Sequence, residues 1–181
     1  MSLFVFPNHY IWTGKVEKHQ EVKDYLMPHI EADDKKSSSW NCDVTSSYGE
    51  NKHFFHNELL INEIVWKPVD LMLGTVQDTI QMPKESSLQE IWYNSYEPGQ
   101  YQEVHNHRPK PIFSGIYLMH LEGKNTTAFV NQHDHPLFNN TKVMDEVEEG
   151  DVIIFPSTLL HYVNPVPANK ITVSYNIGCL F

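Results

Sequence analysis

The spacing of hydrophobic positions changes near residue 85 of the chain. Before it, apolar residues recur among charged ones at helical spacing, which predicts an amphipathic helix over about residues 15–30 with the apolar positions Val16, Val22, Leu26 and Ile30. We expect Pro28 to break or end this helix. A second helix is predicted over residues 58–80, bent or interrupted at Pro68, and the polar, serine-rich residues 33–51 between the helices predict a loop or weak strand.

From Leu88 onward, short β-rich runs alternate with turn residues. The predicted strands cover residues 88–96, 100–107, 112–120, 126–130, 142–147, 151–155 and 170–177. Strands at this spacing predict a sandwich or barrel, so the expected fold class is mainly β with flanking helices, an α+β protein. We expect a single domain, in which residues 1–85 form a helical support that packs against the outside of the β-rich core of residues 86–181.

Composition narrows the classes of function and of partner. Thirteen Lys+Arg against 23 Asp+Glu give a formal charge of −10, which makes nucleic acid a poor candidate for a partner. No apolar run approaches the roughly 18 residues that span a bilayer, and no signal segment opens the chain, so we expect a soluble protein. Cys42 and Cys179 lie far apart without a CxxC pattern, which fits a reducing cytoplasm.

Histidine pairs at HxH spacing suggest a metal site. With 11 histidines in 181 residues, such a triplet is expected by chance roughly 0.7 times, and two occur. His105 and His107 fall within a predicted strand, where residues two apart point to the same face and can reach one cation. His133 and His135 lie in a polar segment before Pro136, and we interpret them as an exposed loop.

A third metal ligand is offered by His161. It follows the turn at Gly150, a wholly apolar predicted strand and Pro156. The sequence therefore predicts a β-barrel that holds one metal ion with His105, His107 and His161. Glu103, two residues before His105, is an alternative to His107 as the third ligand.

The spacing of these residues resembles two families of one fold. Two segments resemble the cupin motifs: Gly99-(five residues)-His105-x-His107 and Gly150-(five residues)-Pro156-(four residues)-His161. The glutamate that the first cupin motif places after its second histidine is absent. Asn94-x-Tyr96-x-Pro98-Gly99-(five residues)-His105-x-His107 is more similar to the iron(II)- and 2-oxoglutarate-dependent oxygenases. The segment from His161 to Val166, with Lys170 nine residues after the histidine, resembles their distal motif. Both likenesses imply a double-stranded β-helix, the jelly-roll or cupin-like barrel.

A narrower likeness covers about residues 88–178 and concerns an uncharacterised oxygenase group of tailed phages and marine bacteria. It is carried by Trp92-Tyr93-Asn94, Phe113-Ser114-Gly115-Ile116-Tyr117, Glu149-Gly150-Asp151, Pro156-Ser157 and Ser174-Tyr175-Asn176. If the chain is encoded by a phage, its location would be the host cytoplasm.

The resemblance implies a role for several residues. In the oxygenases two histidines and a carboxylate hold iron, so His105 and His161 match the histidines, and His107 departs from the pattern by taking the place of the carboxylate. Lys170 would bind the distal carboxylate of 2-oxoglutarate. The positions of Asn94, Tyr96, Tyr117 and Asn176 imply further contacts with 2-oxoglutarate, although each also has an ordinary structural explanation.

The expected activity is that of an Fe(II)- and 2-oxoglutarate-dependent dioxygenase. It would use dioxygen to hydroxylate an unknown peptide side chain or small molecule and release succinate and CO2. The alternative is a three-histidine cupin enzyme that does not use 2-oxoglutarate. A non-enzymatic barrel is disfavoured because three histidines facing one another without metal are awkward to desolvate. Whether the chain forms a homodimer is left open.

Overall fold

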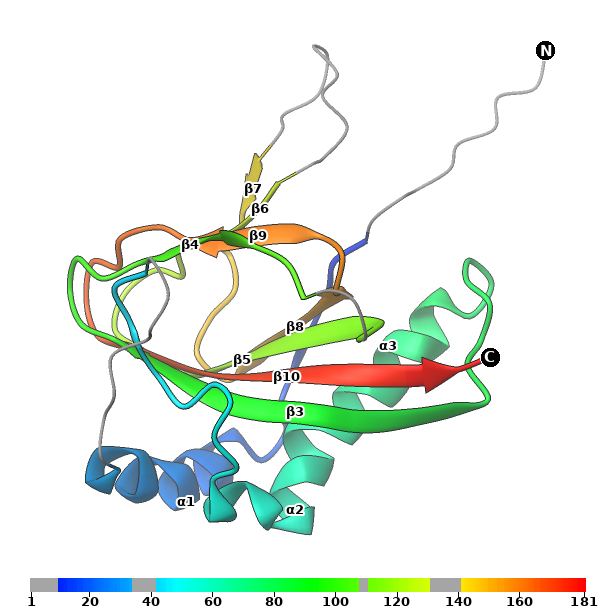
Figure 1. Ribbon diagram of the computed structural model, residues 1–181, viewed down its shortest axis with the longest axis horizontal. Coiled ribbons are helices and arrows are strands. Elements are labelled where there is room, and N and C mark those ends of the chain that lie inside the picture. The colour runs from blue at the N-terminus through cyan, green and yellow to red at the C-terminus, as the bar shows by residue number, and fades with distance from the viewer. Residues whose placement is uncertain (1–9, 34–41, 108–110, 131–140) are drawn as a thin grey trace.

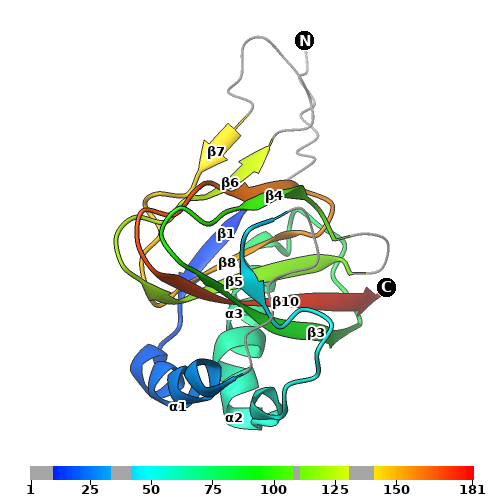
Figure 2. The ribbon, with the colours of Figure 1, turned by 60° about the vertical axis from the view of Figure 1, so that its left-hand side comes forward.

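Two antiparallel sheets form the body of the molecule, seen one above the other in Figure 1 and from a second side in Figure 2. The computed structural model describes residues 10–33, 42–107, 111–130 and 141–181. The major sheet has the order β1 (Trp12–Lys15), β8 (Asp151–Pro156), β5 (Phe113–Leu121), β10 (Lys170–Leu180), β3 (Glu85–Tyr96), β2 (Thr45–Ser46). The minor sheet has the order β4 (Gln102–His105), β9 (Leu160–Val163), β6 (Thr127–Val130), β7 (Thr141–Val143). No hydrogen-bonded pairing among the described residues closes the two sheets into one barrel.

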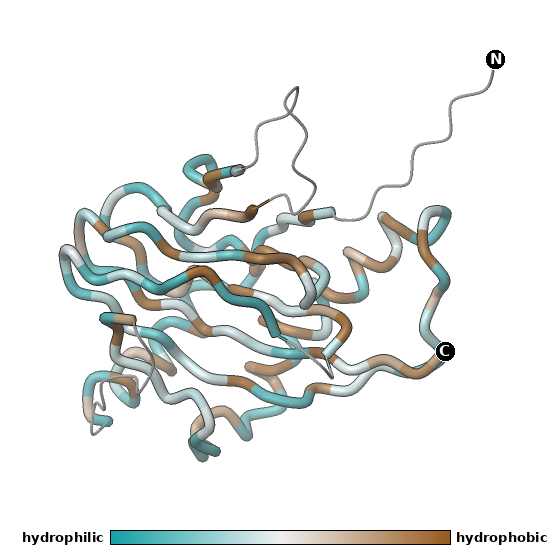
Figure 3. The backbone as a smooth tube through the Cα atoms, turned by 45° about the horizontal axis from the view of Figure 1, so that its top comes forward, coloured by the Kyte–Doolittle hydropathy of each residue, from teal (hydrophilic) through white to brown (hydrophobic). Residues whose placement is uncertain are grey.

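Side chains of alternating direction give the major sheet two apolar faces. On β5, Ile116 and Leu118 belong to the cluster between the sheets, whereas Tyr117 and Met119 belong to the cluster under the helices. A strand that is covered on both faces is buried over most of its length, as β5 and β8 are. Figure 3 shows how hydrophobic and hydrophilic stretches alternate along the backbone tube.

The helices cover the outer face of the major sheet (Figure 1). They are α1 (His19–Ala32), the 3₁₀ turn η1 (His53–His56), α2 (Glu58–Ile61), the π-helical turn η2 (Asn62–Trp66) and α3 (Lys67–Val76). The face of α1 toward the sheet carries Val22, Leu26 and Ile30, which are all buried. Fully burying a side chain such as Leu26 contributes about 2 kcal/mol, which holds the helix in place.

The helices differ in detail from the sequence prediction. Pro28 lies inside α1, which continues to Ala32 because burial of the residues on either side offsets one lost hydrogen bond near the end of the helix. The second helical run extends from Glu58 to Val76, and its irregularity is the π-helical turn just before Pro68. Asn57 caps its start by accepting hydrogen bonds from the backbone N–H groups of Leu59 and Leu60.

Two strands were not predicted from the sequence, namely β1 and β9. Each has four residues, too few for a clear periodicity, and each is defined by its partners, β8 for β1 and both β4 and β6 for β9. The seven predicted strands are all present, with changed ends. The segment with His133 and His135 lies outside the described residues.

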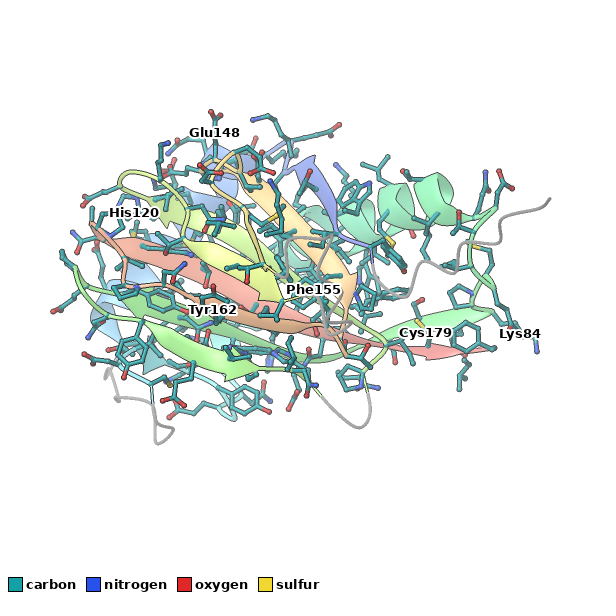
Figure 4. All side chains as sticks on the ribbon, turned by 90° about the horizontal axis from the view of Figure 1, so that it is seen from above. Lys84, His120, Glu148, Phe155, Tyr162 and Cys179 are labelled. Atoms are coloured by element: carbon teal, nitrogen blue, oxygen red, sulfur yellow. The ribbon has the colours of Figure 1, made fainter. Side chains whose placement is uncertain are left out.

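The two ends of the major sheet lie at opposite ends of the long axis of the molecule (Figure 4). His120 and Glu148 lie at one end, and Lys84 and Cys179 lie at the other (Figure 4). At the first end Glu149 joins α1 to the sheet, because its carboxylate contacts Lys23 and His120 and accepts the backbone N–H of Leu121. None of the helices in the described ranges has the length and apolarity needed to span a bilayer.

Candidate metal centre

Three histidines meet between the two sheets. His105 on β4 and His161 on β9 are paired across the minor sheet, and their ring centroids lie 4.2 Å apart. His107 follows β4, and its backbone N–H donates to the carbonyl of Ser157 at 2.9 Å. One ring nitrogen from each histidine lies within 4.8 Å of the others, and no other metal-binding group of this kind occurs among the described residues. The structure thus brings together the three residues that the sequence predicted as ligands.

Each of these histidines has its Nδ1 next to an oxygen that accepts a hydrogen bond. His105 Nδ1 lies 2.7 Å from the backbone oxygen of Glu103, and His161 Nδ1 lies 3.1 Å from that of Leu159. His107 Nδ1 lies 2.7 Å from Oδ1 of Asn176. An acceptor at Nδ1 requires a hydrogen there, so the neutral rings carry their lone pairs on Nε2. This tautomer is the one suited to binding a metal through Nε2.

The protonation state of the three rings also suits a cation. Burial lowers the pKa of His105 to about 4, and the carbonyl of Glu103 offsets this only in part. Burial also lowers the pKa of His107, against the opposing effect of its bond to Asn176, and it holds the pKa of His161 well below its usual range. The imidazoles are therefore neutral near pH 7, as a divalent metal requires. The donor set fits a transition metal such as iron(II).

Aromatic rings flank two of the three histidines, the buried His161 and the partly buried His107. The ring centroids of Phe155 and Phe129 lie 4.7 and 5.9 Å from that of His161. On the other side, the Trp92 ring lies 5.6 Å from that of His107, and Tyr48 packs edge-on against Trp92 at 5.0 Å. Such rings lower the local dielectric and strengthen electrostatic interactions inside the pocket.

Glu103 lies apart from the three histidines. A shift of register between Gln102 and His105 places both of these residues on the pocket side and leaves Glu103 and Val104 exposed. Glu103 lines a shallow groove on the outer surface with Val104 and Tyr162. The alternation that made Glu103 an alternative ligand is therefore interrupted by a β-bulge.

Lys170 carries a buried amine at the same pocket. Its side chain is 1% exposed, and its Nζ donates to Oδ1 of Asn125 and Oγ1 of Thr127, each at 2.8 Å. The amine lies 5.6 Å from the centroid of the Tyr96 ring. Burial lowers the pKa of Lys170 to about 7, and no carboxylate of the described residues forms an ion pair with it. A buried cation with neutral partners is suited to bind a carboxylate.

The pocket connects the histidines with this amine. Its lining includes the three histidines and Lys170 together with Trp92, Asn94, Tyr96, Gln102, Gly115, Ile116, Thr127, Phe155, Val163, Thr172 and Ser174. Asn94 accepts from Ser46 Oγ at 2.7 Å and donates to Ser174 Oγ at 3.3 Å. The hydroxyl of Tyr96 donates to Gln102 at 3.1 Å. The contacts of Asn94 and Tyr96 with 2-oxoglutarate stay predictions.

Two predicted cosubstrate residues do not line the pocket. Tyr117 is wrong as a pocket residue, because the alternation along β5 turns it toward α1, where its hydroxyl lies 2.7 Å from His19 Nδ1. Asn176 lies behind His107 and contacts its Nδ1, so its neighbour is a histidine rather than the pocket.

Sequence reasoning missed the residues that surround Lys170 and His107. Asn125 and Thr127 hold the lysine amine, and Ser114 and Glu90 contact Asn176. Ser114 and Asn176 stand in the short motifs of the narrower resemblance, which is a signal that could have marked them. No sequence signal marked Asn125 or Glu90, because the residues they contact lie on strands distant in sequence.

A family model matches part of the chain. Residues 90–176 match the family model described as "Putative 2OG-Fe(II) oxygenase". No curated protein gives a significant match to the sequence. The likeness to proteins of tailed phages and marine bacteria stays a prediction.

Several solved structures share the fold. A prolyl-4-hydroxylase of Pseudomonas putida aligns at 11% identity with a TM-score of 0.63, over 95% of this chain and 94% of that chain. The viral collagen prolyl hydroxylase of Paramecium bursaria Chlorella virus-1, in a 2-oxoglutarate complex, aligns at 16% identity with a TM-score of 0.60, over 94% and 97%. HygX from Streptomyces hygroscopicus, with nickel, 2-oxoglutarate and hygromycin B, aligns at 10% identity with a TM-score of 0.66, over 94% and 83%. The predicted double-stranded β-helix is thus confirmed.

Proposed function

Because residues 90–176 form a domain of the 2OG-Fe(II) oxygenase family, we propose that this protein is a dioxygenase that hydroxylates its substrate and releases succinate and CO2. The observation that carries the proposal is one pocket with three neutral histidines at one side and the buried amine of Lys170 at the other. The first arrangement suits iron(II), and the second suits the distal carboxylate of 2-oxoglutarate.

His105, His107 and His161 would hold the metal through Nε2. Bound iron(II) would supply the oxidising chemistry that couples decarboxylation of 2-oxoglutarate to hydroxylation. The residues of the chain have simpler tasks. Lys170 binds and orients the cosubstrate by its charge, and Asn94 and Tyr96 offer polar groups along the pocket. The aromatic rings beside His161 and His107 limit the access of water.

A histidine in place of the family's carboxylate changes the charge of the centre. Three neutral ligands leave both positive charges of iron(II) uncompensated by the protein, whereas a carboxylate would remove one. The site should therefore favour a dianionic cosubstrate, since 2-oxoglutarate brings one carboxylate to the metal and one to Lys170.

The second candidate is a three-histidine cupin enzyme that does not use 2-oxoglutarate. The histidine set alone is compatible with it. Lys170 favours the first candidate, because a lysine buried in the pocket beside Asn125 and Thr127 is expensive to desolvate unless an anion binds it.

For the prime substrate we propose a peptide side chain, such as proline, or a small molecule. Structures of similar fold include prolyl hydroxylases and the hygromycin B complex of HygX. The charge of −10 disfavours nucleic acid. Release of succinate from 2-oxoglutarate, measured with proline-containing peptides and with aminoglycosides, would identify the class.

Calorimetric titration tests the cosubstrate. The nickel(II)-loaded protein is titrated with 2-oxoglutarate and with 2-oxobutyrate, which lacks the distal carboxylate. We expect Lys170→Met to weaken 2-oxoglutarate binding by roughly 10- to 100-fold, the effect of one charge-assisted hydrogen bond, and to leave 2-oxobutyrate binding nearly unchanged. The exposed Lys124 provides the matched control Lys124→Met. Equal loss for both ligands, or no preference for 2-oxoglutarate in the wild type, would contradict the proposal.

A further inference from the structure

His107 differs from the other two histidines in the partner of its Nδ1. His105 and His161 contact backbone carbonyl oxygens, which can only accept and therefore fix the tautomer by themselves. His107 instead contacts the side-chain amide of Asn176, at 2.7 Å. An amide has an accepting end and a donating end, so it could in principle pair with either tautomer of His107.

Glu90 determines which end of the Asn176 amide faces His107. Nδ2 of Asn176 donates to Oε2 of Glu90 at 2.8 Å, and a carboxylate can only accept. The amide nitrogen is thereby directed to Glu90 and the amide oxygen to His107. Ser114 reinforces this orientation, because its Oγ donates to Oδ1 of Asn176 at 2.8 Å. His107 must then carry its hydrogen on Nδ1, which leaves the lone pair on Nε2.

The major sheet places these three residues in one row. Asn176 on β10 is paired with Glu90 on β3 and with Ser114 on β5. Asn176 and Ser114 are 2% and 1% exposed, whereas Glu90 is exposed at the edge of this row. The row therefore connects a surface carboxylate with the ring of His107 through one buried amide.

We propose that Glu90 and Asn176 are positioning residues for His107: the carboxylate orients the amide, and the amide holds His107 in the tautomer that binds metal through Nε2. This inference rests on the proposed function, in which His107 is a metal ligand. It also gives the centre a negative charge two hydrogen bonds behind the ligand that replaces the family's carboxylate.

Nickel(II) affinity, measured by competition with a chelator, gives the first test. Glu90→Ala removes an exposed side chain, so the fold should remain, and Glu85→Ala removes a charge of the same sign from the same exposed strand segment. We expect Glu90→Ala to weaken nickel(II) binding at least about tenfold, as loss of a partner behind a metal ligand does, and Glu85→Ala to have less than about a twofold effect.

A double variant distinguishes loss of the orientation of the Asn176 amide from a general loss of structure. In Glu90→Ala/Asn176→Asp, the aspartate accepts the Nδ1–H of His107 at either oxygen and needs no second carboxylate to orient it. We expect the nickel(II) affinity of this double variant to return to the wild-type level or above. Failure of the double variant to regain affinity would overturn the proposal.

The tautomer itself is measured by nitrogen-15 NMR of the imidazole rings in metal-free protein. We expect His107 to be the Nδ1–H tautomer in the wild type and a mixture in Glu90→Ala, with His105 and His161 unchanged as internal references. An Nε2–H tautomer in the wild type, or an unchanged tautomer in Glu90→Ala, would overturn this inference alone. Failure of the wild type to bind nickel(II) would instead overturn the metal centre and the proposed function with it.

Discussion

The buried amine of Lys170 makes the pocket sensitive to pH. Burial lowers its pKa to about 7 in the folded protein, whereas the ordinary value of 10.5 applies in the unfolded chain. Below pH 7 the ligand-free folded protein carries a buried charge, and between pH 7 and 10.5 the lysine loses its proton on folding. The stability of the protein is therefore reduced at and below pH 7 and recovers as the pH rises toward 10.5.

Lys170→Met should remove this dependence. Without a 2-oxoacid, we expect the variant to be more stable than the wild type at pH 7, and the difference to shrink by about 2 kcal/mol between pH 7 and pH 9. Urea unfolding of both proteins at several pH values measures this difference in the free energy of unfolding. A difference that does not change with pH would show that Lys170 has an ordinary pKa.

The histidines give a pH dependence of the same sign at lower pH, so that stability again rises with pH. The pKa of His105 is about 4 in the folded protein and 6.5 ordinarily, so the unfolded chain binds protons first as the pH falls below 6.5. Folding should lose stability from pH 6.5 down to about pH 4. We expect His105→Leu to lessen this loss, measured as the difference in urea unfolding between the two proteins at pH 7 and pH 5. Equal slopes for both would contradict the burial of His105.

At the scale of elements, the geometry of β4 decides which residues reach the metal. Regular alternation along a strand would turn Glu103 and His105 to one face, but the bulge after Gln102 turns Glu103 outward. Such a bulge depends on pairing with β9, a strand of four residues that has no periodicity of its own to reveal it. The histidines could be predicted because their spacing is local, whereas the exclusion of Glu103 depends on a distant partner.

Substitutions on β4 test this arrangement. We expect Glu103→Gln to leave nickel(II) affinity within about a factor of two, because the side chain lies on the outer surface. His107→Gln should weaken binding at least about tenfold, because it removes one of three ligands. Chelator competition measures both. Weaker binding in Glu103→Gln than in His107→Gln would make Glu103 the third ligand.

The predictions for Tyr117 and Pro28 were wrong for the same reason, since each depends on contacts with residues distant in sequence. Tyr117 belongs to a run of buried residues on β5, and a run that is apolar on both faces does not tell which side chains face the pocket. Pro28 was expected to end a helix on propensity alone, but packing of Leu26 and Ile30 against the sheet extends the helix.

At the scale of the whole molecule, two sheets and one layer of helices place the pocket. The helices cover the outer face of the major sheet (Figure 1). The pocket with the histidines and Lys170 is lined by strands of both sheets. The sequence predicted most of the strands and the fold class, because turn residues and β-rich runs are local signals. It could not predict the row of Glu90, Asn176 and Ser114, because these residues come from three strands far apart in sequence.

We propose that iron(II) and 2-oxoglutarate occupy one pocket between the three histidines and Lys170. Anaerobic addition of 2-oxoglutarate to the iron(II)-loaded protein, followed by visible absorption spectroscopy, tests this occupancy. We predict the metal-to-ligand charge-transfer band of a bidentate 2-oxoacid, absent in His161→Ala and weaker at limiting 2-oxoglutarate in Lys170→Met. Tight iron binding without any such band would rule out bidentate 2-oxoglutarate at the metal and favour a three-histidine enzyme that does not use 2-oxoglutarate.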